Sequence, residues 1–315
     1  MTETKLPERR AVKPAEGQER GIVATTQEAM GWRRAVERHQ VTAFFLLAYG
    51  FSWLAELLLF GLLRLPASLT VPVVTFGPAV AALTMTAALE GRAGLSRLWA
   101  RMRLWRVDRR WYGAALLLIP LVYLAGTLVL PAAVASFAPE SPVRLLVTWV
   151  IVLTLGGVIG GPLGEEPGWR GFALPRLQTQ LGPLGGTLLI GFVWAGWHFP
   201  QFLMPEWAAQ NGGLSAATVL VFVGTVLSIA VILTWVFNHT RSSVLIAILA
   251  HSSVNTAQAV LNPLFPAVNT DLNGLIGFGA LAIVILIATR GRLGYPSPEG
   301  VSTLGRVPVP SPSAR

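Results

Sequence analysis

Residues 160–171 read Gly-Gly-Pro-Leu-Gly-Glu-Glu-Pro-Gly-Trp-Arg-Gly, and they introduce two glutamates and an arginine into a largely apolar chain. Hydrophobic residues make up 53% of its 315 residues and charged residues 12%, which is too apolar for an ordinary soluble domain. Ionisable groups inside apolar segments are costly, so Glu165, Glu166 and Arg170 are expected to mark a functional site. We therefore predict an all-α polytopic membrane protein with a polar cavity.

About eight apolar segments, each near 20 residues long, are suited to cross a membrane as helices. They lie near 41–63, 66–89, 112–138, 145–164, 183–204, 214–237, 243–262 and 272–289. We expect one eight-span membrane domain over residues 41–290. Residues 1–40 and 291–315 are richer in Pro, Ser, Gly and charge, which predicts a partly disordered N-terminal tail and a disordered C-terminal tail.

The positions of the basic residues indicate how the chain crosses the membrane. With eight spans and a cytoplasmic N-terminus, only Arg64 and Arg144 among the Lys and Arg residues fall on the outer side. The loop at 90–111 intersperses arginines with leucines and tryptophans, which predicts an interfacial helix on anionic lipid or a simple topology anchor. We expect a multi-pass protein of the cell membrane with both termini in the cytoplasm.

The charge and the lack of cysteine exclude several classes of function. The formal charge is +9, but no basic face with interleaved aromatic residues occurs, so membrane topology explains the charge better than nucleic-acid binding does. The chain contains no cysteine, which excludes disulfides, thiolate catalysis and a Cys-ligated metal.

Glycines and prolines predict how the polar segment is shaped. Residues 156–164 are glycine-rich and should break a helix, whereas Pro167 suits the first turn of the next one. The turn at 182–183 lies about midway between Glu165 and His198. Two helical arms of about 25 Å each would return His198 to the depth of Glu165, so we predict a hairpin that brings the two together.

Helical spacing sorts the polar residues into pairs. Glu166 and Arg170 are four residues apart and can pair on one helix face, while Glu165 points about 100° away. The two carboxylates are therefore expected to have different roles. His251 and Asn255 have the same spacing, so both can face one cavity.

These residues carry a resemblance to a known family. Residues 164–171 resemble the EExxxR motif of the CPBP family, which joins type II CAAX prenyl endopeptidases to bacteriocin-processing and bacteriocin-immunity (Abi) proteins. Residues 194–200, Trp-Ala-Gly-Trp-His-Phe-Pro, are similar to its second motif. Residues 238–243 and 251–255 resemble its third and fourth motifs, and all four occur in the family's order.

The resemblance implies an intramembrane endopeptidase that hydrolyses a peptide bond in a membrane-associated peptide or protein. By matching positions, Glu165 and His198 would activate the attacking water. His251 and Asn255 would position that water or stabilise the tetrahedral oxyanion. Peptide hydrolysis needs a base and donors aimed at developing negative charge, which these residue types supply.

The remaining motif residues are expected to support this chemistry. Glu166 and Arg170 would form a structural pair, or Arg170 would reach a substrate carboxyl group. Trp194 stands where the family more often has phenylalanine, and it would place an aromatic wall beside His198, four residues further along.

A metal is one of two mechanisms that the sequence leaves open. Glu165, His198 and His251 resemble a catalytic zinc set with an open position for water, as the family name metalloprotease implies. Asn255 is an unusual zinc ligand, and a mechanism that depends on the glutamate alone fits the same residues.

Other readings of these residues predict other functions. The same scaffold without catalysis would act in bacteriocin immunity or hold a partner protein. A transporter would also use central ionisable residues, but the chain lacks paired broken segments in two matching halves. Glu56, inside the first span, is expected to snorkel, to pair with an arginine or to line the cavity.

Two expectations rest on the resemblance more than on particular residues. A prenylated cysteine near the substrate's C-terminus is expected from eukaryotic relatives. A bacterial source is expected from the resemblance and from the basic residues, which are 22 Arg and only 2 Lys. Neither the substrate nor the oligomeric state follows from the sequence.

Overall fold

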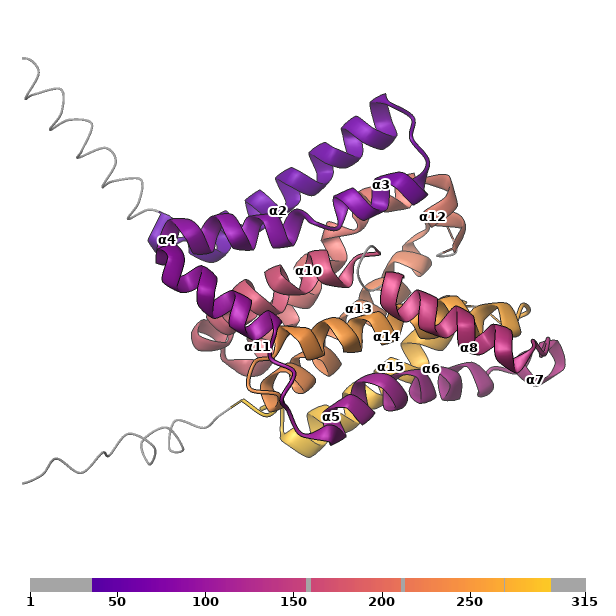
Figure 1. The fold of residues 1–315 in the computed structure, drawn as a ribbon. Helices are drawn as coiled ribbons and strands as arrows, with labels where there is room; N and C mark the ends of the chain where they lie inside the picture. The colour runs from indigo at the N-terminus through magenta and orange to yellow at the C-terminus, as the bar shows by residue number, and fades with distance from the viewer. Residues whose placement is uncertain (1–35, 157–159, 211–212, 269, 296–315) are drawn as a thin grey trace, which may run out of the picture. The chain divides into compact units, whose positions relative to one another are not determined.

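The structure is a computed structural model that describes residues 36–156, 160–210, 213–268 and 270–295. Within these ranges it contains helices and no strands, which confirms the all-α prediction (Figure 1). Most of the two predicted tails, 1–40 and 291–315, lies outside the described residues. The chain divides into two units between Ala43 and Phe44, and all contacts given below lie within the second.

The first half of the chain consists of helices joined by short turns. They are α2 (Gln40–Glu56), η1 (Leu57–Leu62), α3 (Ala67–Val74), α4 (Gly77–Met102), α5 (Arg109–Gly113), η2 (Ala114–Leu118), α6 (Ile119–Leu128), α7 (Ala133–Ser136), α8 (Pro142–Ile151) and η3 (Val152–Gly156).

The second half carries the polar motifs. Its elements are α10 (Pro162–Gly168), η4 (Trp169–Ala173), α11 (Leu174–Trp197), η5 (Phe199–Leu203), α12 (Pro205–Gln210), α13 (Ala216–His239), α14 (Val244–Leu261), η6 (Asn262–Leu264) and α15 (Thr270–Thr289). The π-helical turn η4 directly follows the glutamates, and such turns frequently occur at functional sites.

Six helical segments of the described residues are long and apolar enough to cross a membrane, which supports a multi-pass membrane protein. They are Gln40–Leu62, Ala67–Met102, Arg109–Leu128, Ala216–His239, Val244–Leu264 and Leu272–Thr289. Each matches one of the eight predicted spans, although the helix expected over 112–138 ends at Leu128.

Two of the eight predicted spans take a different form. The segment 145–164 divides into a shorter apolar helix, Pro142–Gly156, and the start of α10. The segment 183–204 contains residues 183–197, the second arm of α11, followed by the short 3-10 helix η5. That arm rises about 22 Å at 1.5 Å per residue, which is less than a hydrocarbon core of about 30 Å.

The arms of α11 meet at Gly182, as the predicted hairpin requires. Gly182 has φ 73° and ψ 171°, which is outside the helical region and which glycine adopts without a Cβ penalty. A Cβ on Gly186, in the second arm, would lie 2.9 Å from backbone atoms of Leu177 and Gln178 in the first. The two arms therefore pack closely because Gly186 has no side chain.

Glycines also bring α10 against the start of α4. A Cβ on Gly164 would lie 2.4 Å from the carbonyl oxygen of Thr75, and one on Gly168 would lie 2.5 Å from Pro78. Gly164 and Gly168 are one turn apart, so both face α4. Small residues allow such close helix packing in membranes. Here they fix the position of α10, and therefore of Glu165.

The most enclosed of the candidate spans is α14. Two thirds of its most apolar window, 67%, is buried inside the molecule, against at most half for the other five spans. It contacts α4, α6, α10 and α13, and Figure 1 shows it among these helices. A polar side chain on α14 is therefore shielded from lipid by neighbouring helices.

The predicted interfacial loop begins as a continuation of α4. Gly91, with φ 60° and ψ −153°, divides α4, so the apolar part ends where the prediction placed the end of the span. Just before it, Glu90 accepts hydrogen bonds from Arg97 in the second part of α4 and from Arg176 in α11. These ion pairs join the arginine-rich segment to the hairpin.

Candidate functional site

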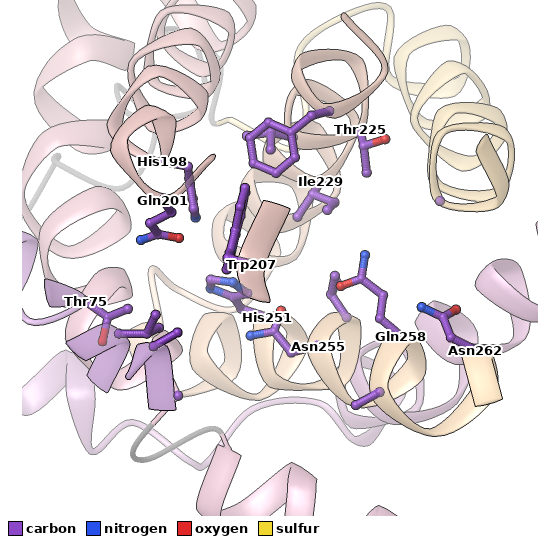
Figure 2. Close-up of a pocket in the computed structure, with 18 of the residues that line it drawn as sticks. Thr75, His198, Gln201, Trp207, Thr225, Ile229, His251, Asn255, Gln258 and Asn262 are labelled. Atoms are coloured by element: carbon purple, nitrogen blue, oxygen red, sulfur yellow. The ribbon is translucent and has the colours of Figure 1, made fainter. Parts of the chain in front are cut away.

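Five of the seven predicted site residues line one cavity of about 1000 Å³. Glu165 comes from α10, Trp194 and His198 from the end of α11, and His251 and Asn255 from α14. Figure 2 shows His198 on one side of this cavity and His251 and Asn255 on another. Residues from three separate segments of the chain therefore share one polar space.

Glu165 occupies the first turn of α10, where a carboxylate is favoured by the helix dipole. Its Oε2 accepts a hydrogen bond of 2.6 Å from the indole Nε1 of Trp194. Its Oε1 lies only 2.6 Å from where a Cβ of Gly161 would stand, and Gly161 has φ 129°. Any larger residue at 161 would be strained and would displace the carboxylate.

His198 follows the last turn of α11 and is held in one orientation. Its Nδ1 donates a hydrogen bond of 2.8 Å to the carbonyl oxygen of Trp194, because a carbonyl can only accept. The neutral ring then has its lone pair on Nε2. Trp197, Trp207 and Phe222 surround the imidazole.

Glu166 and Arg170 form the predicted pair, and both side chains are completely buried. Arg170 Nη1 donates to Glu166 Oε1 at 2.9 Å, and His251 Nδ1 donates to the same oxygen at 2.8 Å. Glu166 therefore orients His251 across 85 residues of sequence, which the helical spacing did not predict. The carboxylate–imidazole contact leaves Nε2 of His251 for other partners.

Trp194 joins the two halves of the site. Besides its bond to Glu165, its ring lies under the guanidinium of Arg170, 4.6 Å from the centroid, and the His251 ring meets it edge-on at 5.1 Å. Glu165 and His198, predicted as partners, share no hydrogen bond in the structure. They are connected through Trp194, by its indole and its carbonyl.

Asn255 lies one turn beyond His251 on α14 and is half-buried at the cavity wall. Among the described residues its side chain has no hydrogen-bond partner, so its amide is available to a ligand. The structure thus brings Glu165, Trp194, His198, His251 and Asn255 to one cavity, and Glu166 and Arg170 are buried beside it.

Two details of the prediction are wrong or only partly right. Pro162, not Pro167, occupies the first turn, because α10 begins earlier and carries Pro167 inside it. Glu56 is 4% exposed, and neither carboxylate oxygen has a hydrogen-bond partner in the described part of the chain. It neither pairs with an arginine nor lines the cavity.

A zinc ion held by Glu165, His198 and His251 stays a prediction. Among the residues that the structure describes, no three His, Cys, Asp or Glu side chains come together as a metal site. The Nδ1 atoms of His198 and His251 are bound to a carbonyl oxygen and a carboxylate, which leaves Nε2 of each ring for a ligand.

Comparisons with known proteins agree with these motifs. Residues 147–257 match the family described as type II CAAX prenyl endopeptidase Rce1-like, which confirms the predicted resemblance. The CAAX prenyl protease 2 of Methanococcus maripaludis is 33% identical over 98 residues, which are 31% of this chain. The chain spans 36% of the length of that curated relative.

Proposed function

Because residues 147–257 are similar to type II CAAX prenyl endopeptidases, we propose that this chain is an intramembrane endopeptidase of that kind. The observation that carries the proposal is the convergence of Glu165, His198, His251 and Asn255 on one cavity from three helices. That set supplies acceptors for the protons of water and a donor for an oxyanion, which are the needs of peptide hydrolysis.

Glu165 accepts a proton from a water molecule as that water attacks the scissile carbonyl carbon. Trp194 Nε1–H holds one oxygen of the carboxylate, so the other is directed at the water. His198, with its lone pair on Nε2, accepts the second hydrogen bond of the water and aligns it. The water oxygen bonds to carbon, and the carbonyl oxygen becomes an oxyanion.

Asn255 Nδ2–H donates to this oxyanion, since its amide has no competing protein partner in the described residues. His251 adds a second donor when its Nε2 carries a proton, and the buried Glu166 carboxylate stabilises the imidazolium that results. The carbon–nitrogen bond then breaks, and the proton held by Glu165 passes to the leaving amine. Removing one such donor typically costs about a hundredfold to a thousandfold in rate.

The substrate class and the setting extend the same proposal. The names of the family and of the archaeal relative refer to CAAX prenyl substrates, so a peptide with a prenylated cysteine near its C-terminus is the first substrate to test. The protein acts in the cell membrane, with both termini and the arginine-rich segment at 90–111 in the cytoplasm, as the positive-inside rule requires. Anionic lipid contacts that segment.

Water activation in this proposal passes through Glu165 and His198, without a metal. The competing interpretation, a non-catalytic scaffold or bacteriocin-immunity protein of the same fold, requires no such chemistry.

The test is a comparison of membrane proteomes from cells with the natural chain and with Glu165→Ala. A precursor that accumulates uncleaved only in the variant identifies the substrate and supports proteolysis. A competing non-catalytic scaffold predicts that the phenotype survives substitution of all four site residues. If the membrane proteins are unchanged in cells that hold Glu165→Ala at the same level as the natural chain, the proposed protease activity is excluded.

A further inference from the structure

A row of polar side chains continues along α14 beyond the catalytic residues. His251, Asn255, Gln258 and Asn262 are separated by four, three and four residues, so they share one face of α14 and its extension η6. All four line the 1000 Å³ cavity. Figure 2 shows them in this order along one side of it.

The amide groups of this row are available for a ligand. Gln258, like Asn255, has no hydrogen-bond partner for its side chain among the described residues. Asn262 uses only its Oδ1, which accepts a bond of 2.5 Å from the hydroxyl of Tyr123.

An amide outside the row points to the same conclusion. Gln201 of η5, which also lines the cavity, is 2% exposed, and its Nε2 has no partner in the described part of the chain. A buried polar group without a partner costs free energy. These groups therefore favour an occupant that offers hydrogen bonds.

The opposite wall of the cavity is largely apolar, and the hydroxyl of Thr225 there already donates to the carbonyl oxygen of Val221. Phe222, Val226 and Ile229 project from α13, and the indole of Trp207 closes the space between α12 and α13. In Figure 2, Ile229 lies across the cavity from the row on α14. The cavity thus has one wall that hydrogen-bonds and one wall that accepts hydrocarbon.

We propose that the amides of Gln258 and Asn262, continuing from Asn255, bind the main chain of an extended peptide whose apolar side chains rest on α13. The proposal rests on the proposed function and specifies how the substrate is held. A primary amide offers both a donor and an acceptor, as a peptide group does, so it binds any sequence in extended form. An acyl chain would leave every amide without a partner.

The length of the row sets the length of the segment that is bound. From His251 to Asn262 the helix rises about 16 Å at 1.5 Å per residue. An extended peptide advances about 3.3 Å per residue, so about five residues lie along the row on one side of the scissile bond. Shorter peptides lose contact with Gln258 and Asn262.

The direct test measures peptide binding by the full-length protein in nanodiscs. The probes are fluorescent eight-residue peptides of Ala, Val and Leu, together with versions N-methylated at one main-chain position each. Gln258→Leu removes the amide at nearly constant size, at a half-buried residue without partners, so folding should persist. Gln180→Leu, an exposed amide on α11, is the matched control.

We expect Gln258→Leu to weaken binding about tenfold, the value of one net hydrogen bond, while Gln180→Leu leaves it unchanged. In the natural protein one N-methyl position should weaken binding by a similar factor. The same N-methyl group should not weaken binding to Gln258→Leu any further, because this variant has already lost the hydrogen bond to the peptide main chain.

The proposal is overturned if no N-methyl position matters in the natural protein, or if the natural protein binds none of the peptides. Displacement of a bound fluorescent fatty acid without peptide binding would identify the cavity as a lipid site instead. Cleavage of the same peptides is followed separately. If the peptides bind in a way that depends on Gln258 but are not cleaved, the proposed protease activity is contradicted and the peptide site is not. If the peptides are cleaved equally with and without Gln258, only the peptide site is contradicted.

Discussion

At the scale of single residues, one indole organises the charges of the site. Trp194 donates to Glu165, lies against the guanidinium of Arg170 and receives the edge of His251. Its carbonyl also fixes the tautomer of His198. A phenylalanine at this position would keep the ring contacts but not the hydrogen bond.

We predict that Trp194→Phe lowers kcat about tenfold and changes KM little. The ring remains over Arg170, but the carboxylate of Glu165 loses a donor, and a hydrogen bond to a charged group contributes about 1.5–3 kcal/mol at most. Trp197→Phe is the matched control, because the buried Nε1 of Trp197 has no partner in the described residues. Equal kinetics for the two variants would show that the indole N–H is not used.

A second prediction concerns the buried carboxylate. Glu166→Gln leaves the fully buried Arg170 without its nearest counter-charge, and breaking a buried pair in this way typically costs about 3–5 kcal/mol of stability. Thermal unfolding in detergent measures the loss, and peptide cleavage should fall as His251 loses its carboxylate partner.

Glu140→Gln provides the comparison for that experiment. Glu140 pairs with Arg144 at the same four-residue spacing and at 3.0 Å, but at the surface. Such pairs contribute about 0–1 kcal/mol to stability, so this variant should have the same unfolding temperature as the natural protein. A Glu166→Gln protein as stable and active as Glu140→Gln would mean that Glu166 neither supports Arg170 nor orients His251.

At the scale of helices, the position of Glu165, the proposed catalytic carboxylate, depends on how closely α10 approaches α4. Gly168 has backbone atoms of Pro78 where its Cβ would be, at 2.5 Å, and backbone cannot move aside as a side chain can. We predict that Gly168→Ala pushes α10 away, lowers the unfolding temperature and reduces cleavage, although alanine favours helices elsewhere.

Gly50→Ala in α2 is the control for Gly168→Ala. Nothing lies within 4 Å of a Cβ at Gly50, so alanine should be neutral or slightly stabilising there. The measurement is unfolding temperature together with cleavage rate for both variants. If Gly168→Ala matched Gly50→Ala in both, the glycine contacts would not determine the position of Glu165.

The helices also show which parts of the site could be predicted from sequence. The Glu166–Arg170 pair was predictable because residues four apart share a face of any helix. The contact of Glu166 with His251 was not, because it depends on how α10 packs against α14. The first turn of α10 was misplaced because Pro162 and Pro167 both suit that position, and only packing decides between them.

At the scale of the whole molecule, composition predicted a helical membrane protein, and six candidate spans support it. The two segments that differ, 145–164 and 183–204, were counted as spans because apolar content alone does not reveal where a helix ends. Glycines interrupt the first, and the second is only one arm of a hairpin. These same interruptions bring Glu165 of the EExxxR motif and His198 to the cavity.

The donor geometry leads to a prediction about metals for the intact protein. Because no metal-binding group of three acidic, His or Cys side chains occurs in the described residues, cleavage should survive dialysis against a zinc chelator. The measurement is the rate before and after dialysis, with elemental analysis of the purified protein. Loss of activity that returns on adding zinc, with about one zinc per chain, would contradict this expectation.

The most direct measurement of the central proposal is cleavage of a prenylated CAAX-type peptide by the purified protein and by Glu165→Gln, both in vesicles. The variant keeps the shape of the side chain and an oxygen for Trp194 but removes the base. We predict cleavage by the natural protein and none by the variant, at matched unfolding temperatures. Cleavage by Glu165→Gln near the natural rate would show that Glu165 does not activate the water.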